Sequence, residues 1–158
     1  MIKAAVLTIS DSCAKGARQD LSGPATTQML TAARIKVTQT AILPDEREQI
    51  AELLRELADA GIDLIVTTGG TGLGPRDVTP EATLDVVQRL VPGLMEVSRA
   101  EGWKKTPNAV LSRGCAGICR NTLIVNLPGS ERAVRECMEV LLPVLPHAIR
   151  MLHGGGHD

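Results

Sequence analysis

Residues 62–72 read Ile-Asp-Leu-Ile-Val-Thr-Thr-Gly-Gly-Thr-Gly, a short apolar run that leads directly into three glycines within four positions. The apolar part, Asp63 to Thr67, has the length and composition of a buried strand. Glycine lacks the Cβ atom that keeps a backbone away from a ligand, so the N–H groups around Gly69, Gly70 and Gly72 can converge on an anion such as phosphate. The alternative interpretation of these glycines is a tight turn that needs positive φ angles and binds nothing.

Length and composition predict one compact domain. The chain has 158 residues, 44% of them hydrophobic and 22% charged, which is enough to bury a single core. We assign residues 1–152 to this domain and residues 153–158 to a flexible tail. Trp103 is the only aromatic residue, so single-stranded nucleic acid finds no stacking platform. The net charge of -1 lacks the basic excess of a phosphate-backbone binder, and we expect no nucleic-acid partner.

The cysteines and the apolar runs bear on location. The four cysteines include no C-x-x-C pair, which favours reduced thiols over disulfides or a metal site. The apolar start of the chain is interrupted by polar residues and lacks a small-residue cleavage site. No run approaches the ~18 apolar residues of a membrane span. We therefore expect a cytoplasmic protein that is neither exported nor bound to a membrane.

Strand and helix patterns alternate along the chain and predict an α/β fold. The predicted strands are 2–9, 37–43, 63–67, 114–119 and 122–126, and the predicted helices are 24–33, 45–61, 79–90, 93–102 and 131–152. Pro143 and Pro146 should bend or divide the last helix. A two-residue turn at Arg120-Asn121 makes one strand antiparallel. The pattern predicts a mostly parallel sheet with one antiparallel strand and helices on both faces.

In such a sheet, ligands gather at the carboxyl ends of the strands, so the loops that follow the strands should lie together. Arg76 and Asp77 would place a cation and a carboxylate beside the glycine turn, unless they form an ordinary surface ion pair. Asp45 follows the second strand and has the position of a helix N-cap, with Glu48 completing a capping box. Mg²⁺ is typically held by one or two carboxylates plus substrate phosphates. Asp45 and Asp77 are therefore candidate metal ligands.

Three further loop segments have both a structural and a binding interpretation. They are Ser10-Asp11-Ser12, Ser112-Arg113 and Pro128-Gly129-Ser130. The first either caps and turns the chain or lines a cleft. The second either offers a hydroxyl and a guanidinium to phosphate or simply ends a surface strand. The third precedes a helix whose free N–H groups favour an anion, although a serine N-cap is the default interpretation.

As a set, six segments resemble the MogA/MoaB family. They are Ser10-Asp11-Ser12, Pro44-Asp45-Glu46, Thr67-Thr68-Gly69-Gly70-Thr71-Gly72, Arg76-Asp77-Val78-Thr79-Pro80-Glu81-Ala82, Leu111-Ser112-Arg113 and Leu127-Pro128-Gly129. The long block from the glycine turn to Ala82 is far more specific than a short glycine pattern, and the resemblance spans nearly the whole chain. The family includes molybdopterin adenylyltransferases and the G domains of gephyrin and its plant counterpart.

The resemblance implies a three-layer α/β/α domain, commonly a homotrimer, with molybdopterin and Mg-ATP as substrates. In the implied reaction the terminal phosphate of molybdopterin attacks the α-phosphate of ATP, pyrophosphate leaves, and adenylyl-molybdopterin passes to a molybdenum insertase. Asp45 and Asp77 match the family's two functional aspartates, which implies that they hold Mg²⁺ and orient phosphates. The segment Gly69-Gly70-Thr71-Gly72 is implied to bind the pterin phosphate, and Ser10 to Ser12 to line the cleft.

Two other interpretations stay open at this point. Some members of this family hold molybdopterin without adenylylating it, and others serve as trimeric scaffold domains, as in gephyrin. The presence of both aspartates favours catalysis over binding alone. The sequence shows no linker or second domain, which disfavours the scaffold.

Overall fold

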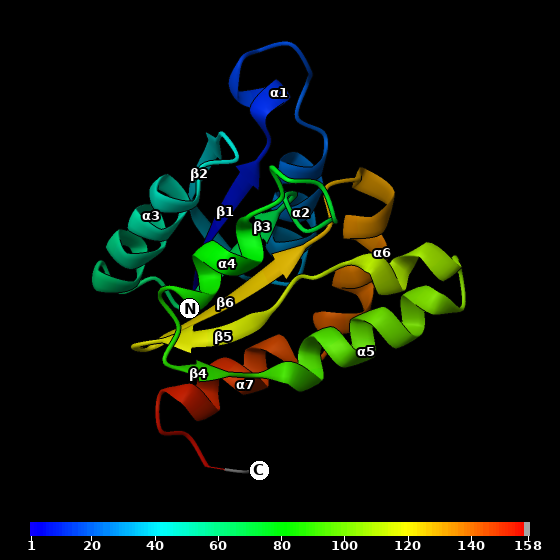
Figure 1. Cartoon of the computed structure of the whole chain (residues 1–158). Coiled ribbons are helices and arrows are strands. Elements are labelled where there is room, and N and C mark those ends of the chain that lie inside the picture. Colours follow the sequence, from blue (N-terminus) through cyan, green and yellow to red (C-terminus); the bar gives the residue numbers. More distant parts are fainter. Residues whose placement is uncertain (157–158) are drawn as a thin grey trace.

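The computed structural model describes residues 1–156, and within them six strands form one central sheet (Figure 1). The strands are β1 (Lys3–Ile9), β2 (Lys36–Leu43), β3 (Leu64–Thr68), β4 (Arg89–Leu90), β5 (Ala116–Cys119) and β6 (Thr122–Leu127). Their order is β2-β1-β3-β6-β5-β4. β5 pairs antiparallel with both of its neighbours, and the other pairings are parallel. β5 therefore runs against the other five strands, which confirms the mostly parallel sheet.

Helices cover both faces of the sheet, which confirms three layers, α/β/α (Figure 1). They are α1 (Asp11–Ala14), α2 (Ser22–Ala32), α3 (Arg47–Asp59), α4 (Thr79–Leu84), α5 (Pro92–Trp103), η1 (Pro107–Leu111, a 3-10 helix), α6 (Glu131–Leu141) and α7 (Leu145–Leu152). Side chains of β1 alternate between the layers. Ala4 and Val6 pack with α2, α5, α6 and α7, whereas Ala5 and Leu7 pack with α3 and α4. Burial on both faces explains the continuous apolar runs of the central strands.

β1, β3 and β6 end at the same level of the sheet. Thr8 of β1 pairs with Thr68 of β3, which in turn pairs with Leu127 of β6. The loops that follow these three strands therefore leave the sheet at one edge, where α/β proteins bind ligands.

The helix predicted over residues 79–90 is wrong in its second half. α4 ends at Leu84, and Arg89–Leu90 form β4 at the edge of the sheet. The N–H of Gln88 donates to the carbonyl of Ile118 at 2.8 Å, and the N–H of Val91 donates to that of Ala116 at 2.8 Å. Pairing with β5 thus overrides the helical spacing of the local sequence.

Other boundaries differ less. α1 lies between the predicted strand 2–9 and the predicted helix 24–33, where no helix was predicted, and α2 begins at Ser22, two residues before Pro24. The last predicted helix is divided near Pro143 into α6 and α7. The predicted flexible tail includes residues 157–158, which lie outside the described residues, and its flexibility stays a prediction. No helix among the described residues is long and apolar enough to cross a bilayer.

Asn126 of β6 fastens the sheet to α4. Its fully buried side chain donates to the hydroxyls of Thr67 and Thr83, both at 3.0 Å. Its side-chain carbonyl accepts the N–H of Cys115 at 3.1 Å. Buried polar groups are almost always paired in this way, because an unpaired one has lost its water without gaining a partner.

We expect Asn126→Ala to lower the free energy of unfolding by about 3 kcal/mol, because two buried hydroxyls and a backbone N–H each lose one hydrogen bond. Urea-induced unfolding measures the change. Asn121→Ala is the matched control in the same hairpin, since Asn121 is exposed and its removal should cost less than about 0.5 kcal/mol. Equal stability of the two variants would contradict the anchoring role of Asn126.

Candidate active site

Loops that follow the parallel strands meet at one edge of the sheet, as predicted. The N–H of Ser10, after β1, donates to the carbonyl of Leu43 at the end of β2, at 2.9 Å. The N–H of Gly69, after β3, donates to the carbonyl of Leu127 at the end of β6, at 3.0 Å. Backbone hydrogen bonds therefore join these loops in pairs and fix their relative positions.

The glycine turn requires glycine at two positions. Gly69 and Gly70 have φ angles of +92° and +68°, in the left-handed region that costs other residues free energy. A Cβ atom at Gly69 would collide with the carbonyl of Ile9, and one at Gly70 would collide with the hydroxyl of Thr79. Gly69 and Gly70 thus have the positive φ angles that a tight turn needs, whereas Gly72 does not, and the same turn borders the cavities described next.

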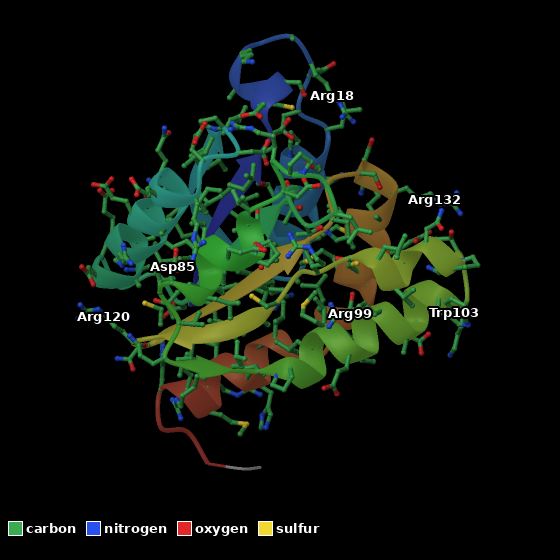
Figure 2. The ribbon with its side chains drawn as sticks, in the orientation of Figure 1. Arg18, Asp85, Arg99, Trp103, Arg120 and Arg132 are labelled. Atoms are coloured by element: carbon green, nitrogen blue, oxygen red, sulfur yellow. The ribbon has the colours of Figure 1, made fainter. Side chains whose placement is uncertain are left out.

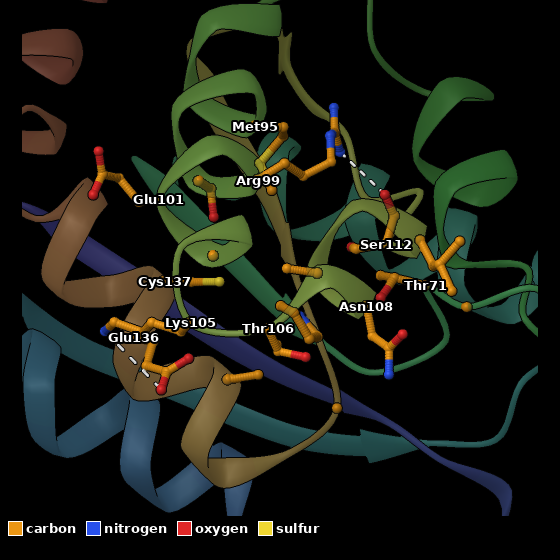
Figure 3. A pocket seen from close by; sticks show the side chains of 18 of the residues that line it. Thr71, Met95, Arg99, Glu101, Lys105, Thr106, Asn108, Ser112, Glu136 and Cys137 are labelled. Carbon is orange, nitrogen blue, oxygen red and sulfur yellow. Dashed lines mark hydrogen bonds and ion pairs between the residues drawn. The ribbon is translucent and has the colours of Figure 1, made fainter.

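Two cavities border the glycine turn. The smaller has a volume of about 370 Å³. The larger, of about 690 Å³, lies between the turn, α5, η1 and α6 (Figure 3). Gly70, Asp77 and Gly129 line both cavities. These three residues therefore mark the place where the two cavities meet.

Most of the predicted site residues border one of these cavities. The smaller cavity is lined by Ser10, Asp45, Gly69, Gly70, Asp77, Gly129 and Ser130. The larger is lined by Gly70, Thr71, Gly72, Asp77, Ser112, Pro128 and Gly129. Four predicted residues line neither: Asp11, Ser12, Arg76 and Arg113.

Asp45 and Asp11 are joined by two reciprocal hydrogen bonds. The N–H of Asp11 donates to the carboxylate of Asp45, and the N–H of Asp45 donates to the carboxylate of Asp11, both at 2.9 Å. The predicted capping box with Glu48 is therefore wrong: α3 begins at Arg47, and the Asp45 carboxylate accepts from Asp11, the first residue of α1, instead of from its own helix. Burial raises the pKa of Asp45, and the nearby charges of Asp11 and Asp77 act in the same direction.

The loop after the glycine turn folds around the carboxylate of Asp77. This carboxylate accepts the N–H of Gly74 at 2.9 Å, and the N–H of Asp77 donates back to the Gly74 carbonyl at 3.0 Å. A Cβ atom at Gly72 or Gly74 would lie only 2.9 Å from the Asp77 carboxylate. Both glycines thus allow the close approach of backbone and carboxylate.

Asp45 and Asp77 line the same cavity, and the charge of Asp77 acts on the pKa of Asp45. Within residues 1–156, no group of three or more His, Cys, Asp or Glu side chains is arranged so that it could hold a metal ion. Two carboxylates that repel each other suit a hard cation that completes its shell with water and phosphate oxygens. The donor set therefore fits Mg²⁺, and it lacks the nitrogen and sulfur ligands typical of Zn²⁺.

One expectation for Arg76 was an ion pair with Asp77 on the surface, but Arg76 binds other carboxylates instead. Its guanidinium binds both carboxylate oxygens of Asp11, at 3.0 and 3.1 Å, and the carboxylate of Glu46 at 2.8 Å. The hydrogen bonds from Arg76 hold the pKa of Asp11 below its ordinary value. Arg76 thus ties the loop of Asp77 to the loops after β1 and β2. Contact of Arg76 with substrate stays a prediction, and it would compete with these ion pairs.

The capping interpretation is confirmed for two of the serines. The hydroxyl of Ser10 accepts the N–H of Cys13 at 3.2 Å and caps α1, while it also contacts the hydroxyl of Ser12 at 3.1 Å. The hydroxyl of Ser130 accepts the N–H of Ala133 at 3.1 Å and caps α6. Capping uses a lone pair of each hydroxyl, so a contact with a substrate phosphate would use the O–H as donor.

Asp20 is a residue of the smaller cavity that the sequence reasoning missed. Its carboxylate accepts the hydroxyl of Thr8 at 2.7 Å and the N–H of Gly23 at 3.0 Å. An aspartate three residues before the N–H that it accepts is a capping pattern. That signal was present in the sequence at the start of α2.

Two cations of the larger cavity were also missed. Arg99 of α5 donates to the carbonyls of Ser112 and Gly114, at 3.3 and 3.0 Å. The Nζ atom of Lys105 lies 4.0 Å from the carboxylate oxygen Oε1 of Glu136 in α6 (Figure 3). No local pattern distinguishes these two residues from other cations on helical surfaces. Only the packing of α5 against α6 brings them to the cavity.

Three of the four thiols, those of Cys115, Cys119 and Cys137, are poorly suited to act as nucleophiles. Burial raises the pKa of Cys115 to about 11 and also raises the pKa values of Cys119 and Cys137. These thiols therefore stay protonated at neutral pH, and the protonated form is a poor nucleophile.

The chain is similar to proteins of one family along most of its length. The family model described as "Probable molybdopterin binding domain" matches residues 5–147. A Helicobacter pylori protein named molybdopterin adenylyltransferase is 41% identical, and the match covers 94% of this chain and 86% of that protein. The molybdenum cofactor synthesis protein cinnamon of Drosophila melanogaster is 46% identical over 93% of this chain but only 25% of its own length. The crystal structure of the molybdopterin biosynthesis enzyme MoaB from Thermus thermophilus is 47% identical and has a TM-score of 0.93, with 100% of both chains covered.

We expect Gly70→Ala to destabilise the protein by about 2 kcal/mol, because alanine is strained at positive φ and its methyl group collides with Thr79. Gly93→Ala is the matched control, since a Cβ atom at this position in α5 meets open space. It should leave stability unchanged or raise it by up to about 1 kcal/mol. Thermal unfolding of both variants measures the difference, and a fully stable Gly70→Ala variant would show that the turn can move.

Proposed function

The chain belongs to the molybdopterin-binding domain family of the MogA and MoaB proteins, and from this membership we propose that it acts in molybdenum cofactor biosynthesis as a molybdopterin adenylyltransferase. The enzyme transfers the adenylyl group of ATP to the terminal phosphate of molybdopterin and releases pyrophosphate. Similarity to a named adenylyltransferase along most of both chains supports this activity.

One observation carries the proposal. Asp45 and Asp77 come from loops after different strands, yet they line one cavity together with Gly69 and Gly70. Two carboxylates beside a glycine turn that lets the backbone approach a ligand suit a cation bound to polyphosphate. A domain that bound the pterin alone would not need both features.

The two cavities suit a reaction between two large substrates. We assign one cavity to each substrate, so that their phosphates meet near Gly70, Asp77 and Gly129, which line both. There an oxygen of the molybdopterin phosphate attacks the α-phosphorus of ATP, and the bond from that phosphorus to the leaving pyrophosphate breaks. Positioning and neutralisation of charge supply most of the catalysis in such transfers, so no protein nucleophile is needed.

Asp45 and Asp77 are the residues that would hold Mg²⁺, which supplies neutralisation of phosphate charge when it is bound. The protein fixes both carboxylates in advance. The N–H of Asp11 holds Asp45, and the N–H of Gly74 holds Asp77. Because these groups are already oriented, little reorganisation is needed during the reaction.

We further propose that the enzyme forms a homotrimer in the cytoplasm and passes its product to a molybdenum insertase. Large apolar side chains are exposed on β4, α5 and η1: Leu90, Val97, Trp103, Val110 and Leu111. Trp103 is 55% exposed at the end of α5 (Figure 2). Exposed apolar groups on neighbouring elements are typical of contact surfaces between proteins, which supports an assembly through this face.

We expect Trp103→Lys to shift the assembly toward smaller species, because a charged ammonium group is costly to bury in an apolar interface. Light scattering of the purified chain over a range of concentrations measures the mass. Val144→Lys replaces an exposed residue that lies between α6 and α7 and should leave the mass unchanged. A trimer that tolerates both Trp103→Lys and Leu111→Lys would assign the interface to another face.

We expect Asp77→Asn to lower turnover on the order of 10²-fold, as the loss of one preorganised electrostatic group does in other enzymes. Pyrophosphate release from molybdopterin, ATP and Mg²⁺ is the measurement, with EDTA as the metal-free reference. The variant should also need more Mg²⁺ for its half-maximal rate. Asp59→Asn is the control, since Asp59 pairs with Arg120 on the surface at 2.7 Å.

The same assay separates catalysis from binding alone. Normal turnover of Asp77→Asn would remove the aspartate from the mechanism. Wild-type protein that binds molybdopterin tightly but releases no pyrophosphate would identify a binding-only member of the family.

A further inference from the structure

Arg113 contacts both ends of the loop of residues 72–77, which ends at Asp77. Its Nε–H donates to the carbonyl of Gly72 at 2.9 Å, and a terminal N–H donates to the carbonyl of Asp77 at 2.8 Å. The other terminal nitrogen binds the carboxylate of Glu81, in the first turn of α4. The backbone N–H of Arg113 also donates to the carbonyl of Thr71 at 2.8 Å. One residue thus holds the start and the end of the loop and the helix that follows it.

These contacts leave Arg113 poorly placed to bind a substrate phosphate. All three guanidinium nitrogens have protein acceptors, and the charge is paired with Glu81. Arg113 lines neither cavity. A planar group with donors in a fixed fork is suited to bridge several acceptors, which a lysine cannot do.

We propose that Arg113 is a positioning residue, which acts on the reaction through Asp77 by fixing the loop of residues 72–77. The inference rests on the proposed role of Asp77 in adenylyl transfer. Apart from Arg113, the loop is held by the hydrogen bonds between Gly74 and Asp77 and by the ion pairs of Arg76. These ion pairs leave from the side chain of Arg76 and do not hold the carbonyls at the ends of the loop. Loss of the hydrogen bonds from Arg113 would therefore let the loop shift and move the carboxylate of Asp77 away from the point where the cavities meet.

The test compares Arg113→Met and Arg113→Lys with Arg47→Met. Arg47 is a matched control, because it makes a similar two-point contact with Asp85, at 2.8 Å for each hydrogen bond, between α3 and α4 and outside the cavities. We expect Arg113→Met to lower kcat by tenfold to 10²-fold, since small displacements of a catalytic group have effects of this size. The KM values for ATP and molybdopterin should change little. Arg113→Lys should recover little activity, whereas a phosphate-binding role would be restored in large part by the lysine charge.

A double mutant tests whether Arg113 acts through Asp77. In the Asp77→Asn background, Arg113→Met should lower kcat by no more than about twofold further, because the group that it positions is already gone. If the double mutant lowered kcat by the product of the two single-mutant factors, the proposal would be overturned. A rise in KM at constant kcat would also overturn it, since that is the signature of lost substrate binding.

Hydrogen exchange without substrates keeps the inference separate from the proposed function. Peptides covering residues 72–77 should exchange at least about tenfold faster in Arg113→Met than in wild type, with no change in Arg47→Met. If the wild-type protein releases no pyrophosphate, the proposed function fails and exchange alone decides about Arg113. Unchanged exchange in Arg113→Met would then overturn the positioning role.

Discussion

A buried network of hydroxyl and amide groups fixes the glycine turn on α4, and the geometry of the site depends on it. The hydroxyl of Thr79 donates to the carbonyl of Gly69, and its N–H donates to the carbonyl of Gly70. The hydroxyl of Thr83 donates back to the carbonyl of Thr79 and also accepts the amide of Asn126. Because the side chains of Thr79, Thr83 and Asn126 are fully buried, each broken bond would leave a polar atom without water. The start of the turn is thus anchored to the buried core.

Beside this anchored turn, the protein brings together carboxylates that repel one another. Asp45 lies close enough to Asp11 and Asp77 for both charges to raise its pKa. Backbone N–H groups hold each carboxylate, and Arg76 neutralises Asp11. Functional sites commonly keep such unfavourable arrangements at some cost in stability. The Mg²⁺ that we propose for this site would relieve the repulsion between the carboxylates.

The parts of this structure that the sequence could predict are those with a local cause. β1 and β3 read as buried runs because both of their faces are covered, and Gly69 and Gly70 stood out because no side chain fits there. Long-range pairing explains the errors. β4 forms because β5 lies beside it, and the carboxylate of Asp45 turned out to bind a residue 34 positions earlier in the chain. The same reason hid the loop contacts of Arg113, which span 36 and 41 positions.

The junction of the two cavities at Gly70, Asp77 and Gly129 also has a kinetic consequence. The two cavities are otherwise lined by different residues: within the described part of the chain, only these three residues line both. Under the proposed assignment of one substrate to each cavity, neither reactant has to pass through the cavity of the other. Such a layout favours a ternary complex before any product departs, and initial-velocity plots should then intersect rather than run parallel as they do for a covalent enzyme intermediate.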